Sequence, residues 1–132
     1  MEQNNNTVIP MDKENKNEQK EIIDVSNAAN VKKKYGEIYE ISVVVDEDDE
    51  NDGRRLVYYF KRPTTASFNR YLKTAGKNMA TSTTNFVIDN IIEEQMIPFK
   101  EECEKYPGLA LNLGQKLLSA IGLGDNVNFR KL

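Results

Sequence analysis

The chain has 132 residues, which suits one domain and is too short for two of ordinary size. It contains no histidine and a single cysteine, Cys103, which excludes Ser-His-Asp and Cys-His catalysis, a typical zinc site and an internal disulfide. Its net charge is −3 and it has no run of about 18 apolar residues, so we expect an intracellular, non-enzymatic protein with no metal, no cofactor and no membrane span.

The first 34 residues differ in composition from the rest of the chain. They are rich in Asn, Lys, Glu and Gln, contain few aliphatic side chains and contain no aromatic one. Such a segment buries too little apolar surface to offset the entropy lost on ordering. The sequence therefore predicts a disordered polar tail over residues 1–34 and a single domain over residues 35–132.

Residues 35 to about 62 are typical of a β-hairpin. Alternation places Tyr39, Ile41 and Val43 on one face of a first strand, and residues 56–61 are dense in β-branched and aromatic side chains. A polar loop over residues 46–53 that ends in a glycine joins the two runs. Two such strands in succession predict an antiparallel hairpin.

Helical periodicity begins after Pro63. Phe68, Tyr71, Leu72 and Ala75 form one stripe of a first helix. A second helix is expected to begin near the cluster 81–84 and to break close to Met96, because Pro98 disfavours a continuous helix. A short acidic helix is expected from residue 99 to about 106.

The last predicted helix follows Pro107. Ala110, Leu113, Leu117 and Leu118 lie on one side of it, and Gly122 or Gly124 is expected to end it. A two-stranded hairpin needs packing partners to be stable. The sequence therefore predicts an α+β fold, with an antiparallel hairpin (about 35–62) packed against three or four amphipathic helices (about 64–122).

The acidic loop over residues 46–52 partly matches the spacing of a calcium-binding EF-hand. Counted from Asp48, however, the twelfth position is Tyr59, where a bidentate glutamate is needed, and the flanking segments are strands. We expect a solvated hairpin tip.

Seven basic residues and no acidic one lie between Arg54 and Asn85. Clustered Lys and Arg beside aromatic residues also suit nucleic acid. The sequence pI of about 5.1 and the assignment of Tyr58, Phe60 and Tyr71 to the core argue against that use. Ion pairs within the fold, or an acidic partner protein, explain the same residues.

The last helix carries more apolar surface than a surface helix of a small domain needs, because Leu109 and Leu111 widen its stripe. The surplus is a candidate docking face for a partner helix.

Four runs of residues also resemble a known family. They are Tyr58-Tyr59-Phe60-Lys61-Arg62-Pro63, Phe68-Asn69-Arg70-Tyr71-Leu72, Phe86-Val87-Ile88 and Tyr106-Pro107-Gly108-Leu109-Ala110-Leu111. Their succession, from about Tyr35 to the C-terminus, resembles small phage and prophage proteins of low-GC Gram-positive hosts, the tail assembly chaperones of long-tailed phages. These motifs are structural rather than catalytic.

In that family a small α+β protein binds the long helical tape measure protein and keeps it soluble while tail tube subunits polymerise around it. The resemblance therefore implies a chaperone in the host cytoplasm whose partners are the tape measure protein and the tail tube protein. The residues expected to contact the partner, or to support the contact face, are Tyr71, Leu109, Leu113 and Leu117, with electrostatic contributions from Arg62 and Arg70.

Two other functions stay open. A structural virion subunit, in the tail or the head–tail connector, would remain in finished particles. A nucleic-acid-binding phage regulator would be retained on DNA or RNA at low ionic strength. A homo-oligomer is also compatible with the sequence.

Overall fold

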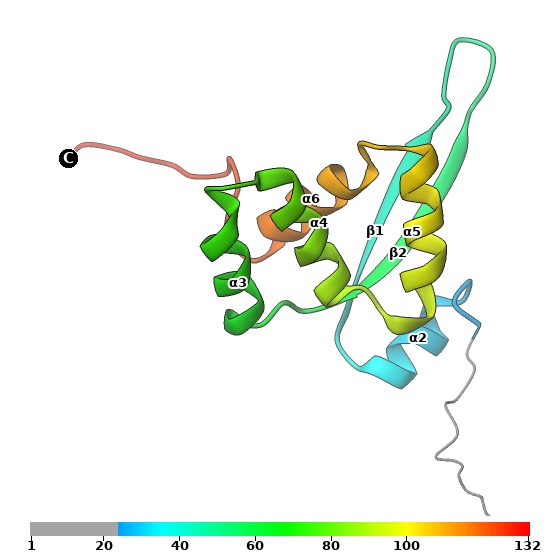
Figure 1. Ribbon diagram of the computed structural model, residues 1–132, viewed down its shortest axis with the longest axis horizontal. Coiled ribbons are helices and arrows are strands. Elements are labelled where there is room, and N and C mark those ends of the chain that lie inside the picture. Colours follow the sequence, from blue (N-terminus) through cyan, green and yellow to red (C-terminus); the bar gives the residue numbers. More distant parts are fainter. Residues whose placement is uncertain (1–23) are drawn as a thin grey trace, which may run out of the picture.

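Two antiparallel strands, β1 (Ile38–Val45) and β2 (Arg54–Lys61), form the hairpin that the alternating sequence predicts. They come from a computed structural model that describes residues 24–132. The register pairs Tyr39 with Phe60 and Ile41 with Tyr58, so the aromatic and aliphatic side chains of both strands share one face. Figure 1 shows the loop between the strands projecting beyond the helices.

Gly53 permits the return of the chain at the end of that loop. Its φ is +81°, and a Cβ atom there would lie 2.4 Å from the carbonyl oxygen of Val45. A side chain is therefore excluded both by the backbone conformation and by lack of space.

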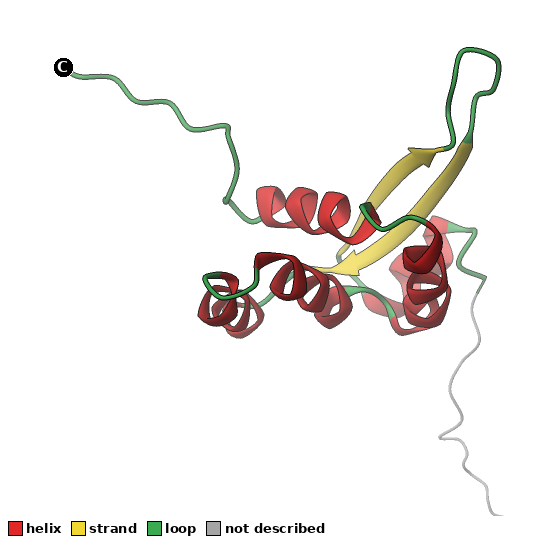
Figure 2. Ribbon diagram, turned by 45° about the horizontal axis from the view of Figure 1, so that its top comes forward, coloured by secondary structure: helices red, strands yellow, loops and turns green. Residues whose placement is uncertain are grey.

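Four helices follow the hairpin: α3 (Thr65–Ala75), α4 (Met79–Asn90), α5 (Met96–Lys105) and α6 (Leu109–Ala120). The side chain of Thr64 caps α3, because its hydroxyl accepts from the amide of Ser67. Figures 1 and 2 place α6 between the hairpin and the α3–α4 pair, in agreement with the contacts between these elements. The predicted α+β fold is thus confirmed.

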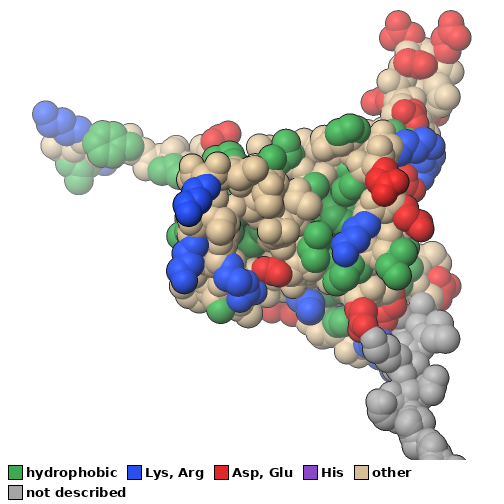
Figure 3. Space-filling model, in the orientation of Figure 1, with side chains coloured by type: hydrophobic (Ala, Val, Ile, Leu, Met, Phe, Trp, Pro, Cys, Tyr) green, Lys and Arg blue, Asp and Glu red, His purple; other side chains and the backbone are tan. Residues whose placement is uncertain are grey.

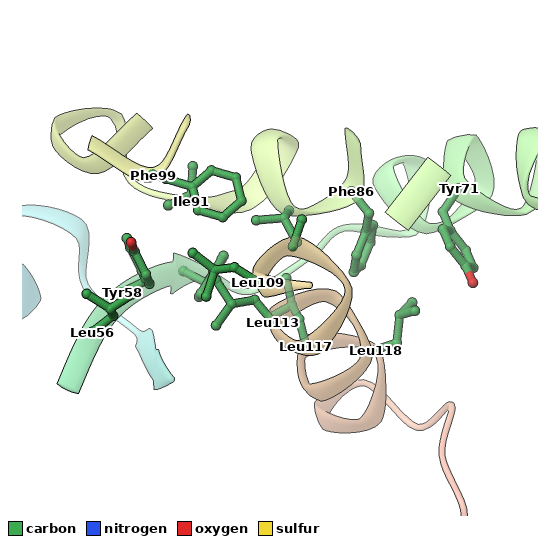
Figure 4. Close-up of a cluster of buried hydrophobic side chains, with 13 residues drawn as sticks. Leu56, Tyr58, Tyr71, Phe86, Ile91, Phe99, Leu109, Leu113, Leu117 and Leu118 are labelled. Carbon is green, nitrogen blue, oxygen red and sulfur yellow. The ribbon is translucent and has the colours of Figure 1, made fainter. Parts of the chain in front are cut away.

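Helix α6 is the centre of the hydrophobic core. Leu109, Leu113 and Leu117 are fully buried. In Figure 4 the leucines of α6 form a row with the β2 residues at one end and Phe86 and Tyr71 at the other. The stripe predicted from the sequence therefore joins both halves of the fold.

The predicted boundary of the polar tail is wrong at its C-terminal end. Residues 28–34 lie in a helix, α2 (Ala28–Tyr35), capped by the side chain of Asn27. This helix buries Val31 in a second cluster with Tyr59 and Ile92, on the other face of the hairpin. The burial of Val31 therefore stabilises α2 in spite of the polar composition of this segment. Residues 1–23 of the predicted tail lie outside the described residues.

The break predicted near Met96, with Pro98 as its cause, is wrong in position and cause, because α4 already ends at Asn90. Ile91 and Ile92 are extended, and the amide of Ile92 donates to the carbonyl of Tyr59 at 3.0 Å. A 3₁₀ turn, η1 (Glu93–Gln95), leads into α5, and Pro98 lies in the first turn of α5, where its missing amide proton costs nothing. Pairing with the outer edge of β2 therefore decides where α4 ends.

Among the described residues, no helix is both long enough and apolar enough to cross a membrane.

The close packing of α4 against α6 can be tested directly by a substitution at Gly114. A Cβ atom on Gly114 would lie 2.2 Å from Cγ2 of Thr83, a stiff β-branched side chain that is itself buried. We expect Gly114→Ala to lower the free energy of unfolding by about 1–3 kcal/mol, measured by urea denaturation. Helix propensity alone would raise it by about 1 kcal/mol. Gly76→Ala is the matched control, because Gly76 has a negative φ and no atom within 4 Å of the added Cβ.

Gln95 closes the outer edge of β2 with both ends of its amide. Its Oε1 accepts from the amide of Tyr59 at 2.8 Å, and its Nε2 donates to the carbonyl of Val57 at 2.9 Å. We expect Gln95→Ala to destabilise the protein by about 2–4 kcal/mol, because both backbone groups lose their partner. The exposed Glu101→Ala is the control on α5, and equal stability of the two variants would contradict this role.

Candidate partner-binding groove

The sequence-predicted apolar contact residues lie inside the protein. Leu109, Leu113 and Leu117 are fully buried, and the ring of Tyr71 packs 6.2 Å from that of Phe68 and 5.6 Å from that of Phe86. In this structure none of the three leucines can touch a partner. The four residues instead hold α3, α4 and α6 in place.

The two predicted arginines lie at the surface. Arg62 donates to the hydroxyl of Tyr39, and Arg70 forms an ion pair with Asp89 across α3 and α4 at 3.2 Å. Figure 3 shows further basic side chains along the α3 side of the molecule, where Lys73 and Lys77 lie. Only part of this basic surface is therefore paired within the fold.

A groove of about 450 Å³ lies between the start of α4 and the outer side of α6, and its lining mixes apolar side chains with polar ones, Asp125 among them. We call it the α4–α6 groove. Its apolar lining is unusually exposed for side chains of this kind: Met79 is 61% exposed, Leu123 48% and Leu111 36%. The residues that line it include Tyr71, Met79, Thr83, Leu111, Gln115, Leu118 and Leu123.

Local sequence signals build this groove. Asn78 caps α4 through the amide of Thr81 and so places Met79 at the first helical position. At the other end Gly122, with φ +108°, reverses the chain, and the amide of Leu123 donates to the carbonyl of Leu118 at 2.9 Å. This helix C-cap brings Leu123 back over the end of α6.

Leu111 is predicted from the sequence as surplus apolar surface, but Met79 and Leu123 are not. Met79 precedes the expected start of the second helix, and Leu123 lies at the expected end of the last one. Asn78 as an N-cap, and Gly122 followed by a leucine as a C-cap with its hydrophobic contact, are the signals that indicate both positions.

The base of the acidic hairpin loop is fastened to α5. Arg54 lies 2.6 Å from a carboxylate oxygen of Glu102, and the hydroxyl of Tyr106 donates to Asp46 at 2.5 Å. The bond to Asp46, together with burial, raises the pKa of Tyr106. Burial near Glu102 raises the pKa of Tyr58 to about 12. These groups therefore hold structure together rather than acting in acid–base chemistry near neutral pH.

Metal-binding clusters are also missing from residues 24–132. In that part of the chain no three acidic or cysteine side chains come together in a way that would hold a metal ion. The α4–α6 groove is therefore taken as the candidate site.

The hairpin and the helices define a small α+β domain that carries the α4–α6 groove at its surface. Residues 31–130 match the model of a family described as a domain of unknown function, DUF6848, and the chain belongs to this family. It is also similar to a solved structure, that of the uncharacterised protein rbstp2171 from Bacillus stearothermophilus. That protein is 26% identical with a TM-score of 0.67, over 79% of this chain and 100% of that one. No curated protein matches the sequence.

Proposed function

We propose that this protein is a phage tail assembly chaperone that binds the tape measure protein in the host cytoplasm and assists tail tube assembly. The observation that carries the proposal is the α4–α6 groove, where three large apolar side chains from different elements are exposed side by side. It acts by non-covalent binding, without catalysis and without a cofactor.

A helix is the partner structure that fits such a groove. An amphipathic helix presents apolar side chains at i, i+3, i+4 and i+7, and a shallow groove between two helices accepts that stripe. A long helical protein with exposed apolar stripes aggregates unless they are covered. Because the α4–α6 groove is small, we expect it to bind the partner helix reversibly. A chaperone needs reversible binding, since tube subunits later take its place on the tape measure protein.

The basic surface of α3 supports the same proposal. Lys73 and Lys77 lie on or just after α3, on the side of the molecule that also carries Arg70. Positive charge beside an apolar groove attracts a partner with acidic flanks and speeds its association. Arg62 lies in the link between β2 and α3. Its bond to the hydroxyl of Tyr39 also helps to hold this link against the hairpin.

The family resemblance seen in the sequence adds support of a different kind. The runs that carry it include Tyr71 and Phe86 in the core and Tyr106 to Leu111 at the junction of α5 and α6. They are residues that fix the relative positions of α3, α4 and α6, and so the shape of the groove. Of the residues that line the α4–α6 groove, Tyr71 and Leu111 lie in these runs, whereas Met79 and Leu123 do not.

Substitutions in the α4–α6 groove test the proposal. We expect Met79→Ser and Leu111→Ser each to weaken binding to a co-expressed tape measure protein by about tenfold or more, measured by titration calorimetry. Both side chains are exposed, so the free energy of unfolding should change by less than about 1 kcal/mol. Ile97→Ser is the matched control, because Ile97 is 69% exposed on α5, outside the groove. Equal losses in all three variants would contradict a role for the groove.

The composition of finished particles separates a chaperone from a structural subunit. We expect mass spectrometry of purified virions to find the tape measure protein and the tail tube protein but not this chain. Lysates taken during assembly should contain the complex of this chain with the tape measure protein. Stoichiometric amounts of the chain in virions would identify it as a tail or connector subunit instead.

A further inference from the structure

The hairpin has one closed edge and one open edge. On β2, Ile92 and Gln95 bond to the backbone of Val57 and Tyr59. On β1, no backbone hydrogen bond joins the outer edge to any other segment within residues 24–132. An open edge is a template for a further strand.

The register shows which groups β1 offers. Because Val57 and Tyr59 direct their amide and carbonyl groups away from β1, their partners Ser42 and Glu40 must direct theirs away from β2. Because this direction alternates along the strand, the backbone groups of Ile38 and Val44 also point away from β2. The open edge therefore carries a regular row of donors and acceptors.

This edge lacks the usual protection against pairing. Its only charged side chain is Glu40, and it contains no lysine and no proline. A groove runs beside it, between β1 and the side of α6 that carries Asn112, Lys116 and Ser119. Its two halves have volumes of about 400 and 440 Å³ and share Glu40, Ile41 and Lys116.

The C-terminal segment of the same chain forms neither helix nor strand. Residues 125–132 have no helix or strand partner, and Phe129 is 92% exposed and Val127 74% exposed. These two apolar side chains lie two residues apart, so they share a face when the segment is extended. The family model extends to residue 130, so the segment belongs to the domain.

We propose that the C-terminal segment of one copy adds as a strand to the open β1 edge of a second copy. The cap at Gly122 directs the segment away from its own hairpin, as Figure 1 shows. The end of α6, five residues before the segment begins, lies close to the edge, because Ser119 and Ala120 line the same groove as residues 38–41. Two copies placed edge to edge therefore hold each other's segment within reach, and the exchange closes a symmetric dimer.

Charge and side-chain alternation agree with this pairing. When Val127 and Phe129 face the groove beside Ile41 and Val43, Asn128 and Arg130 turn to the face that carries Glu40. That face also carries Arg55, which donates to the hydroxyl of Ser42, so Glu40 is the side chain of β1 that Arg130 would approach. The α4–α6 groove shares Ser119 with the groove beside β1, and Asp125 at the start of the segment also lines it. Ser42, Val127 and Phe129 do not line the α4–α6 groove, so variants at these positions test this inference apart from the proposed function.

Two variants of the full chain, studied alone and mixed, test the proposal by sedimentation equilibrium. Ser42→Pro removes one outward amide and leaves the β1–β2 bonds intact, whereas Val127→Ser with Phe129→Ser removes the apolar side chains of the segment. We expect the natural chain to dimerise and each variant to raise the dimer dissociation constant about tenfold or more. An equimolar mixture should associate more tightly than either variant alone, because it restores one segment-to-edge contact. Ser42→Ala and Ile97→Ser are the controls and should dimerise normally.

Hydrogen exchange at single amides completes the test. In the dimer, the amides of Glu40 and Ser42 should exchange more slowly, and dilution should reverse this. A monomer at all concentrations would overturn the proposal. So would a dimer that persists in the double serine variant, which would point to direct β1–β1 pairing. Protection that does not depend on concentration would show that the edge is covered within one chain.

Discussion

The packing of α6 against both the hairpin and α4 is the constraint on which the rest of the structure depends. Its leucines at positions 109, 113 and 117 fill the space above the hairpin, and Gly114 lets α4 approach on the adjacent side. A hairpin of two strands is not stable alone, so α6 supplies the surface on which the α3–α4 pair and the hairpin assemble. Because one side of α6 is committed to this core, its apolar residues on the other side, Leu111 above all, remain at the surface.

The two outer edges of the hairpin differ in whether their backbone groups are hydrogen-bonded within the domain. The outer edge of β2 is closed within the domain by Ile92 and by the amide side chain of Gln95, and this closure ends α4 and turns the chain into α5. The outer edge of β1 receives no such partner from residues 24–132. The α4–α6 groove and the groove beside β1 lie on different sides of α6 and share Ser119 as a lining residue.

Most of the fold follows from local patterns in the sequence. Alternation over residues 38–45 and 54–61 specifies the hairpin, and the stripes of α3 and α6 specify those helices, because each pattern matches one period over its full length. Two features cannot be predicted from local patterns, because they depend on contacts between segments far apart in the sequence. Helix α2 depends on the burial of Val31 against Tyr59 and Ile92, and the end of α4 depends on pairing with β2.

The candidate site was less predictable for a related reason. The most apolar positions of α6 are the ones that a folding domain buries first, so Leu109, Leu113 and Leu117 became core rather than contact surface. The exposed groove takes its lining from residues beside the helix caps, Met79 and Leu123, whose exposure depends on how neighbouring helices are placed.

The central claim is that the α4–α6 groove is where a helical partner binds. Hydrogen–deuterium exchange of the full chain, alone and in complex with the tape measure protein, tests it most directly. Our account predicts slower exchange at the start of α4 and from the later turns of α6 through Leu123, with α5 unchanged. Protection confined to α5 or to the hairpin loop, or no complex at all, would contradict it.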